Sequence, residues 1–313
     1  MKKILSLIIF SLILTGCNNF QKETNSPSDI VKDEASSNYS YQDNFRKKIQ
    51  SKIDSIYQED SDFGGATIGI AHPNGKLYAF AVGYAEISTK TEMRPMDRML
   101  GGSTGKIFVS TSIMLLVEKG ELILDDKIQK YLGDLEWFKR VQNYDKITVR
   151  NLLQHSSGIS RYVFEDSFQI DIHKDANRIW KPSELIRYVL DKEPLFDPGT
   201  DFAYSDTNYI LLGMILEKVS KMTMYDYVDK NILQPFELKG ISPQVNRKID
   251  KLVVGYNKDD DEFYPGVVIE NGEYKYNVQF EWAGGGFVMN ALDLALAGKL
   301  IYESRIFDAT LME

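Results

Sequence analysis

Apolar residues recur every three or four positions where the folded part of the chain begins. This spacing places them on one face of a helix, so it predicts an amphipathic helix; the residues are Phe45, Ile49, Ile53 and Ile56. Two apolar runs follow, ATIGIAHP and LYAFAVGYAEI, on either side of Pro73-Asn74-Gly75. Because Asn-Gly favours a tight hairpin turn, we expect the two runs to form antiparallel strands.

After a polar connection at Ser88–Arg98, the pattern becomes helical over a long stretch. Residues 101–120, GGSTGKIFVSTSIMLLVEKG, form an apolar helix-like run, and Gly120 is suited to end it. Residues that cap helix N-termini precede several further apolar segments. These segments are VRNLLQH after Thr148, ELIRYVLDK after Pro182-Ser183, and TNYILLGMILEKV from Asp206 or Thr207.

Beyond Pro235 the chain returns to strand-like pieces. These are LVVGY, GVVIE and YKYNVQF, with the turn signal Asn271-Gly272 between the last two. A glycine-rich loop at Trp282–Gly286 precedes one more helix from Ala291. The order predicts an α/β fold of the α+β type. An antiparallel sheet flanked by helices, from residues 41–100 and 236–313, would carry an inserted all-α part at 101–235, with a cleft between them.

The N-terminus has the pattern of a secretory signal. Lys2 and Lys3 precede the apolar run Ile4–Leu14, which is short for a membrane span but typical of a signal peptide. Leu14-Thr15-Gly16-Cys17 resembles a bacterial lipobox, so we expect residues 1–17 to be a lipoprotein signal peptide with Cys17 as the lipidated residue. Residues 18–40 are polar and predict a flexible tether that spans on the order of 25–30 Å.

Composition excludes some classes of function. The 313 residues carry a net charge of −8 and no basic stripe, so we expect no nucleic-acid partner. Three histidines and one cysteine, spread along the chain, cannot build a Cys/His metal site, and no cofactor is predicted. The hydrophobic fraction of 43% is that of an ordinary globular protein with a sizeable core.

The chemistry predicted for this chain centres on Ser103 and Lys106. Residues three apart share a helix face, so the hydroxyl and the amine would be neighbours. The N-terminus of a helix offers backbone N–H groups that suit an oxyanion forming at Ser103, while Ile107–Val109 would bury the stem of Lys106. The alternative is a capped helix with an incidental lysine in its first turn.

A second polar motif lies in FDPGTDFAYSDTNY. Tyr204 and Asp206 stand two apart on a loop that leads into a helix. A tyrosine that faces Lys106 could exchange protons with Ser103. Asp206 could anchor the lysine or a substrate amide, or it could simply cap the helix.

These motifs together resemble the serine β-lactamase-like superfamily. The resemblance rests on Ser103-x-x-Lys106, LLQHSSGI at 152–159, Tyr204-x-Asp206 and FDPGTDFAYSDTNYILLG at 196–213. The most similar members are the D-alanyl-D-alanine carboxypeptidases, the class C β-lactamases and the family VIII esterases. The resemblance implies a β-lactamase/transpeptidase-like fold and hydrolysis through an acyl-enzyme.

The resemblance also implies roles for single residues. Ser103 would be the acylated nucleophile, with its backbone N–H as one oxyanion donor. Lys106 and Tyr204 would share general acid and base catalysis, which contributes about 10²–10⁴-fold. Gly284 and Gly285 match a family loop that borders the cleft, although a conformational need explains them equally well. His155 and His72 are interpreted as structural.

One family motif is absent. The family carries Lys- or His-Thr-Gly on a late strand that lines the cleft, and no Lys-x-Gly or His-x-Gly occurs here. That strand would supply the second oxyanion donor, and losing one such donor costs about 10²–10³ in rate. We therefore expect a domain truncated at its C-terminus, without the last strands of the family fold.

Two rival interpretations fail on the sequence. Gly101–Gly105 fits the Gly-x-Ser-x-Gly elbow of α/β-hydrolases, but that fold needs a strand just before the serine and a late histidine. Met93–Leu100 does not have a strand-like pattern. A phosphate-binding loop would need glycine at position 100 and serine or threonine at position 107, where Leu100 and Ile107 stand.

The sequence thus predicts a monomeric, lipid-anchored serine hydrolase on the outer side of a membrane in a bacterial cell envelope. Its substrate would be a D-Ala-D-Ala-type peptide such as a peptidoglycan stem peptide, a β-lactam or a carboxylic ester. The alternative is a catalytically impaired envelope protein that binds peptidoglycan peptides or another partner.

Overall fold

The computed structural model describes residues 39–59, 64–249, 252–256, 266–270 and 273–312. The predicted signal peptide with Cys17 and nearly all of the predicted tether therefore lie outside the described residues. None of the described helices is long and apolar enough to cross a membrane.

The first helix and the hairpin form as the apolar pattern predicts. Helix α1 spans Tyr39–Glu59, and strands β1 (Gly65–Ala71) and β2 (Leu77–Glu86) pair antiparallel, from Gly65 opposite Gly83 to Ala71 opposite Leu77. At the predicted turn, Asn74 Oδ1 accepts the backbone N–H of Lys76 at 3.1 Å. A two-residue strand β3 (Thr91–Glu92) extends this sheet beside β2.

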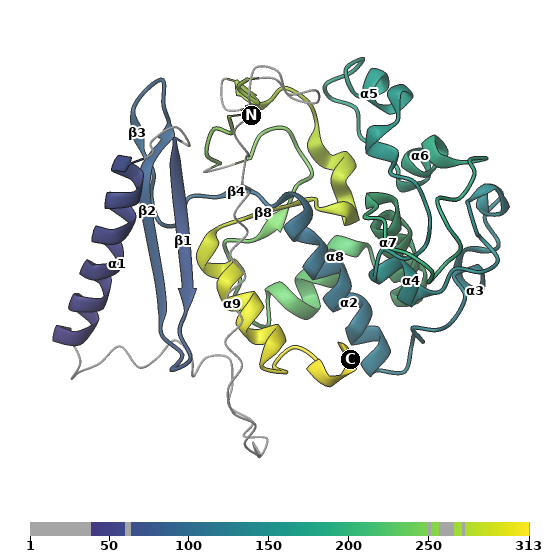
Figure 1. Cartoon of the computed structure of the whole chain (residues 1–313), viewed down its shortest axis with the longest axis horizontal. Helices are drawn as coiled ribbons and strands as arrows, with labels where there is room; N and C mark the ends of the chain where they lie inside the picture. The colour runs from purple at the N-terminus through teal and green to yellow at the C-terminus, as the bar shows by residue number, and fades with distance from the viewer. Residues whose placement is uncertain (1–38, 60–63, 250–251, 257–265, 271–272, 313) are drawn as a thin grey trace. The chain divides into compact units, whose positions relative to one another are not determined.

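A helix covers each side of the hairpin (Figure 1). On one side, Gln50 of α1 donates to the backbone carbonyl of Ala81 at 3.0 Å, and Phe45 packs on Tyr78 with ring centroids 4.7 Å apart. On the other side, α9 (Ala291–Tyr302) packs against β1 and β2. The strands are thus shielded on both faces, which explains their nearly continuous apolar sequence.

The described residues from Gly102 to Leu233 form helices and turns. Helices α2 and α7 are the longest of them and pack against one another, with Phe108, Ile113, Ile210 and Ile215 fully buried. The α-helices are α2 (Lys106–Glu118), α3 (Gln129–Leu132), α4 (Val149–Leu153), α5 (Asp166–Ile172), α6 (Pro182–Ile186), α7 (Asp206–Ser220) and α8 (Met224–Val228). Shorter helical turns are η2 (Gly102–Gly105), η3 (Phe138–Arg140), η4 (Tyr162–Phe164), η5 (Arg187–Val189) and the π-helical η6 (Asp229–Leu233).

A second small sheet joins distant parts of the chain. Strand β8 (Phe287–Met289) lies between β4 (Met99–Leu100) and β5 (Ser242–Pro243), and both neighbours are antiparallel to it. A third, two-stranded sheet consists of β6 (Ile269–Glu270) and β7 (Glu273–Tyr274). The remaining helical turns are η7 (Val278–Gly284) and η8 (Ala309–Met312).

The structure corrects three strand predictions. Met93–Leu100, judged unlike a strand, contains β4, because pairing with β8 does not need a long alternating pattern. LVVGY forms isolated bridges, with Leu252 opposite Arg98 and Tyr256 opposite Val267, rather than a strand. The second half of YKYNVQF enters η7, because the Asn277 side chain accepts the backbone N–H of Gln279 and caps the turn. The predicted turn Asn271-Gly272 lies outside the described residues.

Candidate active site

Ser103 lies in the turn between a sheet strand and a long helix. Strand β4 ends at Leu100, the backbone N–H of Gly101 donates to Phe287 at 2.8 Å, and Ser103 then follows within η2. Helix α2 begins at Lys106, so Ser103 precedes the helix by one turn. The side chain of Ser103 is exposed, as a nucleophile requires.

Lys106 is buried, with 6% of its surface exposed, and its ammonium group reaches three acceptors. Nζ lies 2.7 Å from Asp206 Oδ1 and 3.3 Å from Ser103 Oγ, and it donates to the backbone carbonyl of Gly284. An ammonium group has three N–H bonds, so these partners account for all of them. When Lys106 loses one proton, two N–H bonds can still satisfy Asp206 and Gly284, and the lone pair then faces Ser103.

Asp206 holds two cations at once from the first turn of α7. Besides Lys106, its Oδ2 accepts Arg161 Nη2 at 2.7 Å and Nε at 3.1 Å. Burial alone would raise the pKa of Asp206, but Lys106 and Arg161 outweigh burial and keep it below the usual value. The sequence left several roles open for Asp206, and one of them was to anchor Lys106. The structure shows this contact. Arg161 was not among the predicted site residues.

Tyr204 lies over this charge network. Its ring centroid is 5.0 Å from Lys106 Nζ and 5.1 Å from Arg161 Cζ. Its hydroxyl is buried and has no hydrogen-bond partner among the described residues. A buried hydroxyl without a partner is costly, so this atom is available to a substrate or to a proton in transfer.

His155 fixes the loop that carries Tyr204. Its carbonyl accepts the N–H of Ala203 at 3.0 Å, its Nδ1 accepts the N–H of Ser205 at 3.2 Å, and its ring lies against the Tyr204 ring at 4.3 Å. Burial, followed by the charge of Lys106, lowers the pKa of His155 to about 4, so the ring is neutral at pH 7. The neutral ring accepts from Ser205 and positions Tyr204 from behind.

The glycine-rich loop closes on the serine turn. Gly284 supplies the carbonyl that accepts Lys106. A Cβ on Gly285 would lie 2.4 Å from the carbonyl oxygen of Gly102 and 3.1 Å from the backbone nitrogen of Ser103. Glycine at position 285 therefore lets the backbone of this loop lie directly against the turn that carries Ser103. Trp282, the first residue of this loop, has the unusual φ and ψ angles of 35° and −117°.

Glu281 is a second acidic group that sequence reasoning missed. Its Oε2 is shielded from solvent and has no hydrogen-bond partner among the described residues. Burial raises the pKa of Glu281 to about 7, while the charge of Lys106 lowers it and that of Asp206 raises it. Its position directly before Trp282–Gly286 is the only signal in the sequence that could have indicated it.

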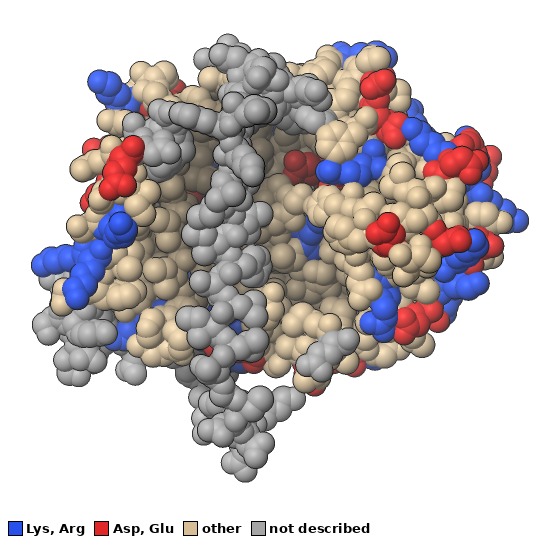
Figure 2. Space-filling view, in the orientation of Figure 1, with Lys and Arg blue, Asp and Glu red and all other residues tan. Residues whose placement is uncertain are grey.

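The structure thus brings Ser103, Lys106, Asp206 and Gly284 into direct contact and places Tyr204 beside them. Among the described residues no group of three or more His, Cys, Asp or Glu side chains could hold a metal ion. Figure 2 shows a hollow near the middle of this face of the molecule, and acidic and basic side chains lie set back within it.

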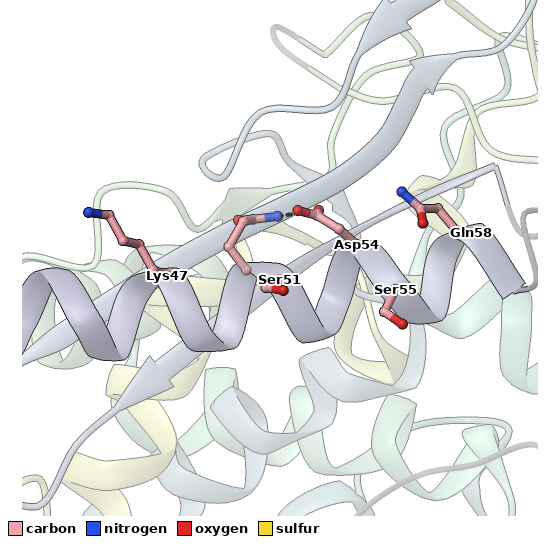
Figure 3. Close-up of a pocket in the computed structure, with 6 residues that line it drawn as sticks. Lys47, Ser51, Asp54, Ser55 and Gln58 are labelled. Atoms are coloured by element: carbon pink, nitrogen blue, oxygen red, sulfur yellow. Dashed lines mark hydrogen bonds between the residues drawn. The ribbon is translucent and has the colours of Figure 1, made fainter.

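A separate shallow concavity lies on α1 (Figure 3). All of its lining residues come from this one helix, and within it Gln50 Nε2 donates a hydrogen bond to Asp54 Oδ1 at 2.8 Å. It has no nucleophile paired with a base, so the site around Lys106 is the better candidate.

Comparison with known proteins identifies the family of this chain. A model of the beta-lactamase family matches residues 51–306, and the chain therefore belongs to this family of serine hydrolases. The predicted superfamily and the predicted α/β fold class are both confirmed.

Three similar proteins show how far the likeness extends along the chain. Protein flp of Staphylococcus aureus strain MW2 is 30% identical over 213 residues, which is 66% of this chain and 41% of that protein. The D-stereospecific amidohydrolase from a Streptomyces species has a TM-score of 0.68 and 25% identity, over 80% of this chain and 71% of that structure. The penicillin-binding protein homologue from Pyrococcus abyssi has a TM-score of 0.67 and 28% identity, over 84% of this chain and 58% of that structure. The chain thus spans less than half the length of the first curated relative.

Proposed function

We propose that this protein hydrolyses an amide or an ester through an acyl-enzyme on Ser103. The observation that carries the proposal is the coordination of Lys106. Asp206 and Gly284 occupy two positions around Nζ, and the third is directed at Ser103 Oγ, 3.3 Å away. This is the nucleophile-and-base geometry that acyl transfer needs, and it would tighten when substrate binds.

In the proposed acylation step, Ser103 Oγ attacks the substrate carbonyl and Lys106 accepts the hydroxyl proton. The proton then reaches the leaving amine or alcohol through Tyr204, whose buried hydroxyl has no other hydrogen-bond partner among the described residues. In the second step water attacks the acyl-enzyme carbonyl and gives one proton to Lys106 or Tyr204, which pass it to Ser103 Oγ as the bond between Oγ and the acyl group breaks and the acid product leaves. Arg161 acts indirectly, because it holds Asp206 and thereby the lysine.

The negative charge on the substrate oxygen would bind at the Ser103 N–H. This N–H belongs to the turn η2 just before helix α2, and the Gly285 backbone packs against that turn and helps to hold it in place. A preorganised donor of this kind contributes about 10²–10³ in rate.

We also propose, from residues 1–40 alone, that the mature protein is tethered through Cys17 to a membrane of the bacterial envelope. The lipobox resemblance and the polar composition of residues 18–40 support this location. Two of the similar structures are named as an amidohydrolase and as a homologue of a penicillin-binding protein, which favours an amide-type substrate for this chain.

Intact mass spectrometry of the natively expressed protein tests the proposal. We expect a lipid mass on Cys17, and one added mass after incubation with a penicillin or with a fluorophosphonate, the latter a general serine-hydrolase probe. Ser103→Ala should abolish both adducts, whereas the neighbouring exposed Thr104→Ala should keep them. If neither reagent labels Ser103, the catalytically impaired binding protein becomes the better interpretation.

A further inference from the structure

Asp206 divides its carboxylate between two cations. Its Oδ1 lies 2.7 Å from Lys106 Nζ, while its Oδ2 accepts Arg161 Nη2 at 2.7 Å and Nε at 3.1 Å. The Asp206 side chain is only 10% exposed, so water does little to stabilise its charge. The three side chains therefore form one charged group, in which each cation affects the other through the shared carboxylate.

The charge balance of this group changes when Lys106 takes part in the reaction. While Lys106 is protonated, the group has two positive charges and one negative charge. When Lys106 has lost its proton and can act as a base, Arg161 and Asp206 still balance each other, because a guanidinium group keeps its proton in proteins. The reactive form of the site is thus the electrically balanced one.

Without Arg161 this order would be reversed. Asp206 and Lys106 would balance each other only while Lys106 is protonated, and loss of that proton would leave a buried carboxylate without a cation. An uncompensated buried charge is strongly unfavourable. Lys106 would therefore hold its proton more tightly, and a smaller fraction of it would be available as a base at neutral pH.

The other titratable groups around Lys106 leave this balance in place. Burial, followed by the charge of Lys106, lowers the pKa of His155 to about 4, and burial raises the pKa of Tyr209 to about 12, so both rings are neutral at pH 7. The rings of Tyr204 and Tyr209 lie 5.0 and 5.5 Å from Nζ. Burial raises the pKa of Glu281 to about 7, so this carboxyl changes its charge near neutral pH, and it is kept unchanged in every comparison below.

We propose that Arg161 is a positioning residue that sets the pH range in which Lys106 can act as a base, because it balances Asp206 once the lysine is neutral. The inference rests on the proposed function of Ser103 and extends it to a residue that reaches Lys106 through Asp206. This role is electrostatic. A mere loss of position would lower the rate at every pH, whereas a loss of charge moves the pH dependence itself.

The rate of fluorophosphonate labelling between pH 5 and pH 10 tests this role, because attack by Ser103 needs a neutral Lys106. Arg161→Gln can still donate to Asp206 but has no charge. The midpoint of its rising limb should move up by about one pH unit, with about tenfold slower labelling below it. Arg161→Lys keeps the charge, so its midpoint should stay within about 0.3 pH unit of wild type.

Arg178→Gln is the matched control. Arg178 also binds one carboxylate, with Nη2 3.0 Å from Glu184, and its Cζ lies 3.7 Å from the Trp180 ring. Its side chain is 26% exposed, against 32% for Arg161. Because neither Arg178 nor Glu184 belongs to the group around Asp206, this variant should label at the wild-type rate with the wild-type midpoint.

A direct titration of Lys106 makes the test independent of catalysis. In protein labelled with ¹³C at the lysine Cε atoms, NMR follows the loss of the proton, and the Lys106 signal is the one missing from Lys106→Arg. The same upward shift is expected in Arg161→Gln. Equal midpoints in this variant and wild type, or a Lys106 that stays protonated in both, would overturn the role of Arg161. If the titration shifts but no protein is labelled at Ser103, the proposed function fails and the electrostatic role of Arg161 stands.

A double variant covers the case in which Arg161→Gln does not fold. Arg161→Gln combined with Asp206→Asn leaves no buried charge unpaired. Because the carboxylate is also gone, its Lys106 midpoint should lie at the wild-type value or below. A midpoint about one pH unit above wild type would contradict the proposal, since Arg161 would then act without Asp206.

Discussion

At the scale of single residues, the site is a compact arrangement of buried charge. Lys106 and Arg161 share the carboxylate of Asp206, and Glu281 adds a further acidic group nearby. Removing one partner of a buried ion pair costs about 3–5 kcal/mol, because it leaves the other charge unpaired. Asp206 therefore supports the fold as well as the chemistry.

Glu281 should make the stability of the protein depend on pH. Its pKa is about 7 in the folded chain against 4.5 for the ordinary group, so between these values the folded state keeps a proton that the unfolded state has lost. The free energy of unfolding must then fall as pH rises through this window. Glu281→Gln removes the titration, so the stability of the variant relative to wild type should rise between pH 5 and pH 8, by up to about 3 kcal/mol.

Urea unfolding of both proteins at pH 5 and pH 8 measures this change. Any fixed cost of placing an amide at position 281 is present at both pH values and cancels from the comparison. The same difference between variant and wild type at both pH values would show that Glu281 does not change its protonation within this range.

The sequence predicted part of this arrangement. Ser103 and Lys106 share a helix face at fixed spacing, and Tyr204 and Asp206 stand in a short motif, so local patterns were sufficient to identify them. Their catalytic roles stay predictions. Arg161 was missed, although it stands two residues after LLQHSSGI, because nothing local shows a contact with a residue 45 positions away.

At the scale of the elements, strand β1 depends on a close approach by α9. The helix begins at Ala291, and its first residues lie against Gly69 in the middle of the strand. A Cβ on Gly69 would be 2.1 Å from the carbonyl oxygen of Ala291 and 2.7 Å from the Cα of Leu292. Any side chain at position 69 must therefore displace the helix N-terminus.

Gly69→Ala should destabilise the protein by about 1–3 kcal/mol, the usual cost of overfilling a packed contact. The matched control is Gly298→Ala within α9, where an added Cβ meets nothing within 4 Å. That change should stabilise the protein by about 0.5–1 kcal/mol, since alanine favours a helix over glycine. Thermal or urea unfolding shows whether each substitution lowers or raises the free energy of unfolding. Equal effects of the two substitutions would mean that β1 and α9 do not pack as described.

Element prediction succeeded where the pattern was long and failed where it was short. The hairpin β1–β2 and helix α1 have regular spacing and a strong turn signal at Asn74-Gly75, and both formed as expected. Strands β4, β5 and β8 have two or three residues each, which is too few to show alternation. Their existence depends on distant partners: Met289 lies opposite Met99, 190 positions away, and Val288 lies opposite Ser242, 46 positions away.

At the scale of the whole molecule, the site is assembled from three distant segments. Lys106 binds Asp206 and Gly284, which are 100 and 178 positions further along the chain. These partners lie on α7 and η7, so neither the helical segment nor the late segment can complete the site by itself.

Labelling of Ser103 should therefore report the integrity of the whole folded region. In a urea series, we expect fluorophosphonate labelling to disappear at the same urea concentration as the far-ultraviolet circular dichroism signal of the helices. The physical reason is that Lys106 loses its position once either α7 or η7 separates from α2. Loss of labelling at clearly lower urea, with the helices intact, would show that the site opens independently.

The small sheet β5–β8–β4 has a consequence for how the nucleophile is placed. Strand β4 leads directly into Gly101, which still bonds to Phe287 before the chain turns to Ser103. Each residue advances a strand by about 3.3 Å, so a shift of β4 by one residue along β8 would displace Ser103 by about the distance that now separates its Oγ from Lys106 Nζ. The register of these two backbone pairs therefore sets the position of Ser103, the proposed nucleophile, and insertions or deletions between Arg98 and Gly102 should be far less tolerated than changes of side chain.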